Sequence, residues 1–214
     1  MLHYDIWQDE GGFDSLEESI KSIGKNKALT EEIIEVLEIL IDKIDFLERE
    51  IKLSYSQPLK LHSRYTREQI LAAFEFHTFN KKSSNREGVA ENKKTKTELL
   101  FVELIKSEKD FSPSTLYKDY AVSEKIFHWQ SQNSAMPESG KGLSYITHKV
   151  DDKTVLLFVR ERNADEFGIT MSYVFLGEVT YKDHYGRKPM SINWELKEPI
   201  PPYLLKDSVK MAVG

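Results

Sequence analysis

Apolar residues near the start of the chain recur at steps of three and four, the spacing that forms one face of a helix. Thr30 is a suitable N-cap, and the acidic residues that follow it favour the first turn of a helix. This pattern predicts a packing helix that runs from Thr30 to about Leu53. Its apolar positions are Ile33, Val36, Leu37, Leu40, Ile41, Ile44 and Leu47. Capping boxes at residues 15–18 and 66–69 predict two further helices.

In the second half of the chain the apolar residues form short, bounded runs, which are typical of strands. Residues 99–105 and 154–160 are two such runs. Residues 172–181 and 190–196 are predicted to form a hairpin across segment 184–189, which contains Gly and Pro. About five strands with such turns predict a curled, antiparallel, barrel-like sheet. The predicted fold class is therefore α+β, with short helices in the domain and the N-terminal helices packed beside the sheet.

Composition removes several kinds of chemistry. The 214 residues are 40% hydrophobic and include no cysteine, which excludes disulfides, thiolate nucleophiles and zinc held by cysteine. The apolar runs are far shorter than a membrane span, and aspartates stand near the N-terminus where a signal peptide carries lysines. The protein is therefore expected to be cytoplasmic and to have no membrane partner.

Charge divides the chain into two predicted parts. Residues 1–60 carry 7 Lys and Arg against 14 Asp and Glu, a net charge of −7, and are interpreted as an acidic helical connector. Residues 61–214 carry 23 against 21, a net charge of +2, and are interpreted as the α+β domain. Within it, residues 81–96 are lysine-rich and are predicted to form a mobile surface loop. Such a loop is either a solvated connection or a contact to phosphates that ignores base sequence.

Residues 127–132, Phe-His-Trp-Gln-Ser-Gln, combine aromatic rings, an imidazole and two carboxamides. In a strand, alternation places Phe127, Trp129 and Ser131 on one face and the other side chains on the opposite face. That second face carries His128, Gln130 and Gln132. It is interpreted as a recognition surface. The alternative is an edge strand with Phe127 and Trp129 in the core and polar side chains that face water.

Several ordered motifs resemble one known family. They are residues 106–120, Phe-His-Trp-Gln-Ser-Gln at 127–132, Tyr-Ile-Thr-His at 145–148, Leu-Phe-Val-Arg at 157–160, Phe-Leu-Gly-Glu at 175–178 and Lys-Pro-Met-Ser at 188–191. Together they resemble the domain of unknown function at the C-terminus of bacterial DEAD/DEAH-box helicases. Such helicases are often fused to a phospholipase-D-like nuclease and encoded among restriction or phage-defence genes. The resemblance covers roughly residues 61–205, and residues 1–60 are similar to the preceding helical connector.

The resemblance implies helicase and nuclease domains as partners, in cis or in trans, but this chain carries no motor. It has no phosphate-binding loop of the form Gly-x-x-x-x-Gly-Lys-[Ser/Thr]. The nearest trace is Ser139-Gly140-Lys141, and Ala135 stands where the first glycine is required. ATP hydrolysis is therefore excluded, and no cofactor is expected.

The first function class is recognition of nucleic acid, as in the small β-barrel readers of the PUA/SRA-like kind in restriction systems. Aromatic rings stack on bases, carboxamides read base edges and basic side chains contact phosphates. DNA, modified or structured, is the expected ligand. A structural role is the alternative for each candidate: Trp129 in the core, Arg160 in an ion pair, and the Arg-Lys turn solvated. The candidates are Tyr117, Tyr120, His128, Trp129, Gln130, Gln132, Arg160, Arg187 and Lys188.

Two other function classes stay open. A metal-dependent nuclease or phosphodiesterase needs converging carboxylates or histidines. Glu103 and Lys106 are one residue too far apart to share a strand face. The pair His128 with His148, and His184 near Asp183 as a metal ligand, are weak candidates. No catalytic residue or metal ligand is therefore assigned. The third class is a protein–protein docking module, in which a partner covers the apolar face of the acidic helices.

Overall fold

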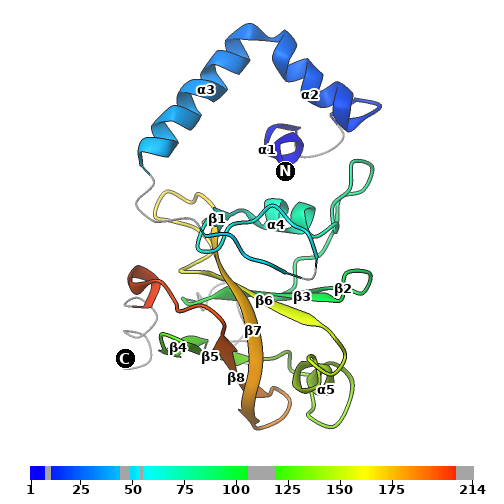
Figure 1. Cartoon of the computed structure of the whole chain (residues 1–214), viewed down its shortest axis with the longest axis vertical. Coiled ribbons are helices and arrows are strands. Elements are labelled where there is room, and N and C mark those ends of the chain that lie inside the picture. Colours follow the sequence, from blue (N-terminus) through cyan, green and yellow to red (C-terminus); the bar gives the residue numbers. More distant parts are fainter. Residues whose placement is uncertain (8–10, 44–48, 54, 106–118, 206–214) are drawn as a thin grey trace.

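The computed structural model describes residues 1–7, 11–43, 49–53, 55–105 and 119–205, which form helices and one large sheet (Figure 1). The helices are α1 (Leu2–Trp7), α2 (Leu16–Lys25), α3 (Lys27–Asp42), α4 (Arg67–Ala73) and α5 (Gly140–Ile146). The strands are β1 (Arg64–Tyr65), β2 (Val89–Asn92), β3 (Thr97–Glu103), β4 (Tyr120–Ser123), β5 (Ile126–Gln130), β6 (Thr154–Arg160), β7 (Tyr173–Tyr185) and β8 (Ser191–Leu196).

The eight strands form one sheet in the order β2-β3-β6-β7-β8-β5-β4, with β1 paired to β7. Every pair is antiparallel except β3 with β6, which run parallel with Thr97 opposite Thr154. The predicted antiparallel pairing is therefore wrong here: β4, β5 and α5 come between β3 and β6 in the chain, and a connection of this length allows β6 to run parallel to β3. Among the described strands β2 and β4 end the order and do not pair, so the sheet is not a closed barrel.

The sheet separates two hydrophobic cores. The core between the sheet and α4 includes Ile70, Phe74, Phe101, Phe158 and Phe175. The second, called the inner core, lies on the opposite face of β3, β6 and β7 and is shared with one face of β5 and β8. It includes Phe127, Trp129, Tyr145, Ile192 and Trp194. Strands β3 and β6 are buried on both faces, which explains why their sequences are almost continuously apolar.

Local sequence signals set several element ends as predicted. The Ser15 hydroxyl accepts a hydrogen bond from a backbone N–H and begins α2, and residues 66–69 form the capping box of α4. Strands β7 and β8 pair as the predicted hairpin. Helix α3, however, begins after Asn26, whose side chain caps it, and not after Thr30. The Thr30 hydroxyl instead donates to the Ile23 carbonyl at 2.9 Å, which fixes the corner between α2 and α3.

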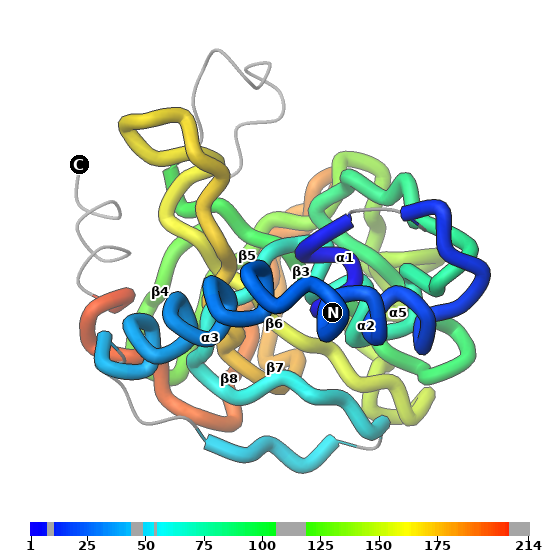
Figure 2. The backbone as a smooth tube through the Cα atoms, turned by 90° about the horizontal axis from the view of Figure 1, so that it is seen from above, coloured from blue at the N-terminus to red at the C-terminus, as the bar shows by residue number. Residues whose placement is uncertain are grey.

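Helix α3 stands away from the rest of the molecule. It ends at Asp42, and residues 49–53 are not helical, so the prediction of a helix that continues to Leu53 is wrong. None of its residues is buried, although the sequence predicted a packing helix. In Figure 1, α2 and α3 arch away from the sheet, and from above α3 crosses in front of β3 and β6 (Figure 2). Helix α1 lies closer, because the Gln69 amide of α4 donates to the Asp5 carboxylate at 3.0 Å.

Candidate nucleic-acid interface

A row of side chains crosses the outer face of β4, β5, β8 and β7 at positions set by strand register. Tyr120 lies opposite His128, His128 opposite Asn193, and Asn193 opposite Asp183. Residues opposite one another on paired strands point to the same face of a sheet. The Tyr120 ring stacks on the His128 ring, with centroids 4.7 Å apart and planes inclined by 17°. The Asn193 amide donates a 2.6 Å hydrogen bond to the Asp183 carboxylate.

A second row runs beside the first, two residues away on each strand. Gln130 lies opposite Ser191 and donates to its hydroxyl at 3.3 Å, and Tyr185 lies opposite Ser191 from the other side. The Tyr185 hydroxyl is 3.0 Å from His128 Nε2, which joins the two rows. The Asp119 carboxylate accepts a 2.8 Å hydrogen bond from the Gln130 backbone N–H and holds the end of β5. The two rows together are called the polar-aromatic face.

Exposure differs sharply within the polar-aromatic face. His128 is 3% exposed, since its ring lies between Tyr120 and Tyr185. Tyr185 is 59% exposed and can contact another molecule. Gln130 is half-buried. The face therefore presents an exposed ring that contacts a buried histidine, and a carboxamide that is held by Ser191.

Two predicted site residues, Trp129 and Gln132, lie on the inner side of the sheet. Trp129 is 5% exposed and packs edge-on against Tyr145, with centroids 5.2 Å apart, so it belongs to the core. Gln132 was predicted to share a face with His128, but β5 ends at Gln130 and alternation stops there. Its carbonyl oxygen instead accepts a 2.9 Å hydrogen bond from the Tyr145 hydroxyl. Burial raises the pKa of this hydroxyl, which keeps it a neutral donor.

Arg160, a predicted phosphate contact, is held inside the protein. It is 8% exposed, forms an ion pair with Glu103 and donates to the Asn163 side chain at 2.6 Å. Its guanidinium lies 4.4 Å from the centre of the Tyr173 ring, which is part of the core against α4. These contacts separate Arg160 from the polar-aromatic face.

Arg187 and Lys188 lie in the turn between β7 and β8, next to Tyr185, and both are exposed. The Arg187 guanidinium is 3.6 Å from the Glu138 carboxylate, a loose contact between two exposed groups. These two residues are therefore the basic candidates that the fold places beside the polar-aromatic face. Tyr117 and Lys106 lie outside the described residues.

The sequence did not place Asp183, Tyr185, Ser191 and Asn193 on this face, although β8 carried a signal. Its sequence, Ser-Ile-Asn-Trp-Glu-Leu, alternates polar and apolar residues throughout, as expected of a strand with one buried face. Which β7 residues accompany it depends on a register shift between Tyr181 and Asp183. Such a bulge has no reliable sequence signature, so the sequence could not show which β7 residues share this face with β8.

A buried ionic cluster, also missed, connects β2, β3 and α5. Glu98 is fully buried and accepts hydrogen bonds from Lys141 at 2.8 Å and Lys153 at 2.7 Å, and Glu91 accepts one from Lys141 at 2.7 Å. Burial favours a higher pKa for Glu91, but the hydrogen bonds and charges of the two lysines outweigh it and lower that pKa. Two lysines thus neutralise two carboxylates, and the cluster fastens α5 to the sheet.

Among the described residues, the predicted pair of His128 with His148 does not form. In the described ranges, no group of three His, Cys, Asp or Glu side chains could hold a metal ion. His148 packs against Trp194 on the inner side, opposite His128 on the outer side, so the two do not pair. His148 Nδ1 is 3.0 Å from the Lys153 carbonyl, and its Nε2 accepts from the Tyr181 N–H at 3.1 Å. Burial lowers the pKa of His148, so it serves as a neutral hydrogen-bonding link.

The lysine-rich segment 81–96 is not one continuous loop, contrary to the prediction. Residues 89–92 form β2, which pairs with β3, and Val89 and Ala90 are buried. The lysines therefore lie on two separate segments on either side of β2. The prediction failed because it relied on the many lysines of the segment and overlooked the two apolar residues, Val89 and Ala90, that begin β2.

Comparison with known proteins assigns a family to most of the chain. A family model described as Domain of unknown function (DUF3427) matches residues 59–207, which include the whole polar-aromatic face and leave out α1 to α3. A search of curated proteins gave no match. In the part of the chain that the structure describes, no helix is long and apolar enough to cross a membrane.

Proposed function

Since the chain belongs to the family of the domain of unknown function DUF3427, whose description assigns no activity, we propose from its surface chemistry that it is a nucleic-acid-recognition module. In this proposal the polar-aromatic face contacts bases, and Arg187 and Lys188 contact phosphates. The ligand is DNA in a modified or structured form. The proposal also includes helicase and nuclease domains as partners in bacterial restriction or phage defence, with the cytoplasm as the site of action.

The observation that carries this proposal is the supported, exposed ring of Tyr185. Its hydroxyl contacts His128, and the His128 ring stacks on Tyr120, so these two side chains hold the exposed Tyr185 ring in position. A side chain that is already positioned loses little conformational freedom when a ligand binds. Stacking of a nucleobase on such a ring contributes about 1–3 kcal/mol per base and tolerates any base.

Gln130 adds a group that distinguishes bases. One of its amide hydrogens is donated to Ser191, so by its chemistry the carbonyl oxygen and the second hydrogen remain for a base edge. A carboxamide presents this donor–acceptor pair to adenine. The carboxylates of Asp119 and Asp183 repel phosphates from the centre of the face, which favours a backbone path along the turn that carries Arg187.

A binding panel tests this function. Single-stranded, duplex, branched and base-modified DNA are titrated with the whole chain by fluorescence anisotropy, with and without divalent metal. Tyr185→Ala is expected to lower affinity by about 5- to 150-fold, the equivalent of about 1–3 kcal/mol. Phe167→Ala is the matched control, because Phe167 is also an exposed ring, at 80%, but lies between β6 and β7. Equal losses in both variants, or no binding to any DNA, would contradict the proposal.

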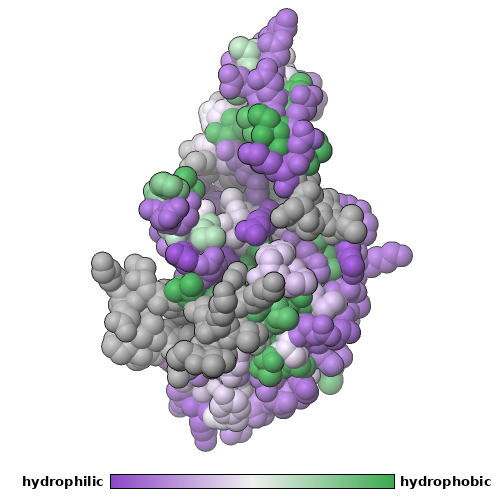
Figure 3. Space-filling model, turned by 90° about the vertical axis from the view of Figure 1, so that its left-hand side faces the viewer, coloured by the Kyte–Doolittle hydropathy of each residue, from purple (hydrophilic) through white to green (hydrophobic). Residues whose placement is uncertain are grey.

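A second candidate function, protein docking, is favoured by the uncovered face of α3. Its exposed apolar side chains are Ile34, Val36, Leu37, Ile39, Leu40 and Ile41. Figure 3 shows green patches on the projecting helical part at the top of the molecule. Apolar surface of this extent on one helix is characteristic of interaction sites. The helix also carries Glu31, Glu32, Glu35, Glu38 and Asp42, so we propose a partner helix with an apolar face flanked by Lys and Arg.

Two synthetic amphipathic peptides test the docking function. Both carry Leu at the apolar positions, and one has Lys and the other Glu at the flanks. The Lys peptide is expected to bind the whole chain at least about tenfold more tightly. Leu37→Asp is expected to abolish this binding, whereas Val150→Asp, at another exposed apolar residue, leaves it unchanged. Equal binding of both peptides, or self-association by light scattering that Leu37→Asp removes, would exclude a basic partner helix.

A further inference from the structure

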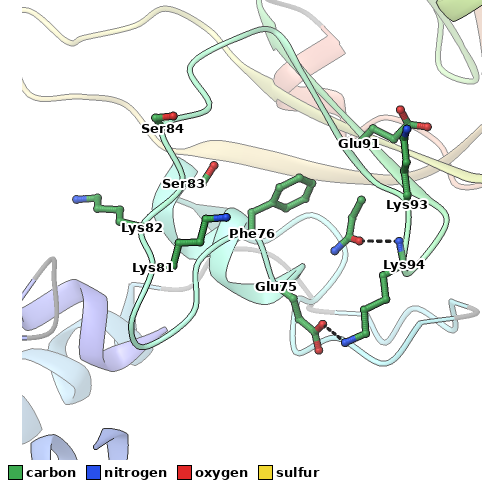
Figure 4. A pocket seen from close by; sticks show the side chains of 10 residues that line it. Glu75, Phe76, Lys81, Lys82, Ser83, Ser84, Glu91, Lys93 and Lys94 are labelled. Atoms are coloured by element: carbon green, nitrogen blue, oxygen red, sulfur yellow. Dashed lines mark hydrogen bonds and ion pairs between the residues drawn. The ribbon is translucent and has the colours of Figure 1, made fainter. Parts of the chain in front are cut away.

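A groove lies at β2, at the other end of the strand order from β5 and β4. It is formed by the end of α4, residues 81–84 and the turn between β2 and β3, and has a volume of about 490 Å³ (Figure 4). Four strands, β3, β6, β7 and β8, separate β2 from β5 in the sheet order. A ligand in this groove would therefore occupy a site separate from the rows around His128.

The groove carries uncompensated positive charge. Lys94 is paired with Glu75 at 2.8 Å, and Glu91 is neutralised by the ionic cluster. For Lys81, Lys82 and Lys93, by contrast, the described part of the chain contains no carboxylate within ion-pairing distance. In Figure 4, Lys81 extends from one wall toward Phe76, Lys82 projects from the same segment to its outer side, and Lys93 stands on the other wall. Three lysines thus remain for an anionic ligand.

The first wall of the groove is held in place by internal hydrogen bonds. The Thr78 N–H donates to the Lys81 carbonyl at 2.9 Å, and the Lys81 N–H donates back at 3.1 Å. The Ser83 N–H donates to His77 Nδ1 at 2.8 Å. Burial lowers the pKa of His77, which favours the neutral ring that this hydrogen bond requires.

The second wall is tied to the end of α4 through Asn92. Its side-chain amide donates to the Phe74 carbonyl at 2.8 Å, and its side-chain oxygen accepts from the Lys94 N–H at 3.0 Å. The turn that carries Lys93 is therefore fixed relative to the first wall. A site whose walls are already positioned does not have to be ordered by its ligand.

An aromatic ring lies between the walls. Phe76 is only partly buried, and in Figure 4 its ring points into the space between the two lysine-bearing segments. Ser83 and Ser84 add hydroxyl groups beside it. A positively charged groove with an aromatic ring is the arrangement by which proteins bind single-stranded nucleic acid. The sequence indicates these lysines as possible phosphate contacts, but nothing in their spacing joins them to Phe76.

We propose that this groove binds the sugar–phosphate backbone of one nucleic-acid strand, with Lys81, Lys82 and Lys93 at phosphates and a base on Phe76. The inference rests on the proposed function in taking nucleic acid as the ligand, and it adds a second, strand-binding site. The groove contributes affinity without base selection, since phosphates carry no sequence information. Base selection belongs to the polar-aromatic face.

Anisotropy titrations with labelled oligothymidine of about 12 nucleotides test the groove. The triple variant Lys81→Gln, Lys82→Gln, Lys93→Gln is expected to lower affinity at least about tenfold. It is also expected to reduce the slope of log affinity against log salt by about 2, since each single-strand phosphate contact contributes about 0.7. The triple variant Lys21→Gln, Lys25→Gln, Lys27→Gln is the control, because it removes the same charge from α2 and α3. Equal losses of affinity in the two triple variants would show that only the net charge of the protein matters, and would overturn the proposal.

Phe76→Leu tests the stacking contact, because leucine keeps apolar packing against the core and removes the aromatic face. It is expected to weaken oligothymidine binding about 5- to 150-fold, with an unchanged thermal melt. Wild-type affinity in this variant would overturn the role of Phe76.

Competition separates a nucleic-acid strand from a free phosphate as the groove's ligand. Pyrophosphate at constant ionic strength is expected to compete weakly. The proposal fails if the triple variant loses pyrophosphate binding but keeps wild-type affinity for oligothymidine. The groove is then a site for a free anion. Loss of binding in Tyr185→Ala but not in the groove variants would reject the groove alone. No binding of any nucleic acid would reject the function as well.

Discussion

The two faces of β5 and β8 share one backbone and differ in what covers them. On the inner face, Phe127, Trp129, Ile192 and Trp194 are at most 5% exposed, because β3, β6 and Tyr145 of α5 pack against them. On the outer face the same strands carry His128 and Gln130, and Tyr185 of the neighbouring strand β7 is 59% exposed. The inner residues are fixed by packing, whereas the outer face combines the buried His128 with an exposed ring and a half-buried carboxamide. Tyr185 and Gln130 are therefore better candidates for recognition than the core tryptophan.

Trp129→Ala, on the inner face, is expected to have the largest effect on stability. It leaves a cavity against Tyr145 and Trp194 and is expected to lower the free energy of unfolding by about 3–5 kcal/mol. Urea unfolding followed by far-UV circular dichroism measures the change. The outer-face variant Tyr185→Ala serves as the control and is expected to cost no more than about 1 kcal/mol, because it removes an exposed ring and its hydrogen bond to His128. A similar loss in both variants would contradict the division into a core face and a surface face.

His128→Ala is expected to have an intermediate effect, since this histidine is buried although it lies on the outer face. The variant loses the stack on Tyr120 and the contact to Tyr185, and is expected to lower the free energy of unfolding by about 1–3 kcal/mol. The sequence placed His128 on a recognition surface, but at 3% exposure it supports that surface from below. Urea unfolding together with DNA titration checks this, because Tyr185 loses its support and affinity falls as well. A fully stable variant with unchanged affinity would show that the rows are not coupled.

Acidification probes the inner face through His148. Its pKa is lowered from 6.5 by burial, so below about pH 6.5 the unfolded chain binds more protons than the folded protein. Its contribution to stability is present above this pH and is lost as pH falls, by up to about 1.4 kcal/mol per pH unit. Melting curves between pH 7.5 and 5.5, the range that includes this transition, measure the loss. His148→Asn is expected to make the pH dependence shallower, and an unchanged slope would place the titration at another group.

Gln130→Ala is expected to have the smallest effect on stability and a clear effect on recognition. The side chain is half-buried and makes a 3.3 Å hydrogen bond to Ser191, so its removal is expected to cost about 0.5 kcal/mol or less. Affinity for adenine-containing sites is expected to fall relative to other sequences by about 1–3 kcal/mol. Parallel melts and titrations measure the two quantities. A loss of several kcal/mol in stability would assign Gln130 a structural role instead.

The sequence predicted the parts of the fold that depend on neighbouring residues. The capping box at residues 66–69 and the hairpin of β7 with β8 needed only local spacing and turn residues. Trp129 matched the alternative in which it lies in the core. Helix α5 was missed because its 7 residues, two of them glycine, give a weak helical pattern.

The remaining features depend on residues far apart in the chain. Lys153 meets Glu98 across 55 positions, and Arg160 meets Glu103 across 57. The parallel pair β3 with β6 and the approach of Tyr185 to His128 are also long-range. Hydrophobic periodicity gives each strand a buried face but does not select its neighbour, so neither the ionic cluster nor the polar-aromatic face was visible.

The strand order has a consequence for how the chain is made. During synthesis, β4 and β5 emerge before β7 and β8, and β8, the last of the described strands, lies between β5 and β7 in the finished sheet. Until β8 is released, β5 lacks its partner strand on that side, so the His128 ring is not held against Tyr185. Pairing β5 with β8 closes the long chain segment between them, which costs conformational entropy before the contacts form. Proteins whose contacts join residues far apart in the sequence fold more slowly for this reason. The recognition surface is therefore among the last features to form, and a ribosome-bound chain that stops before β8 has the aromatic residues but not their arrangement.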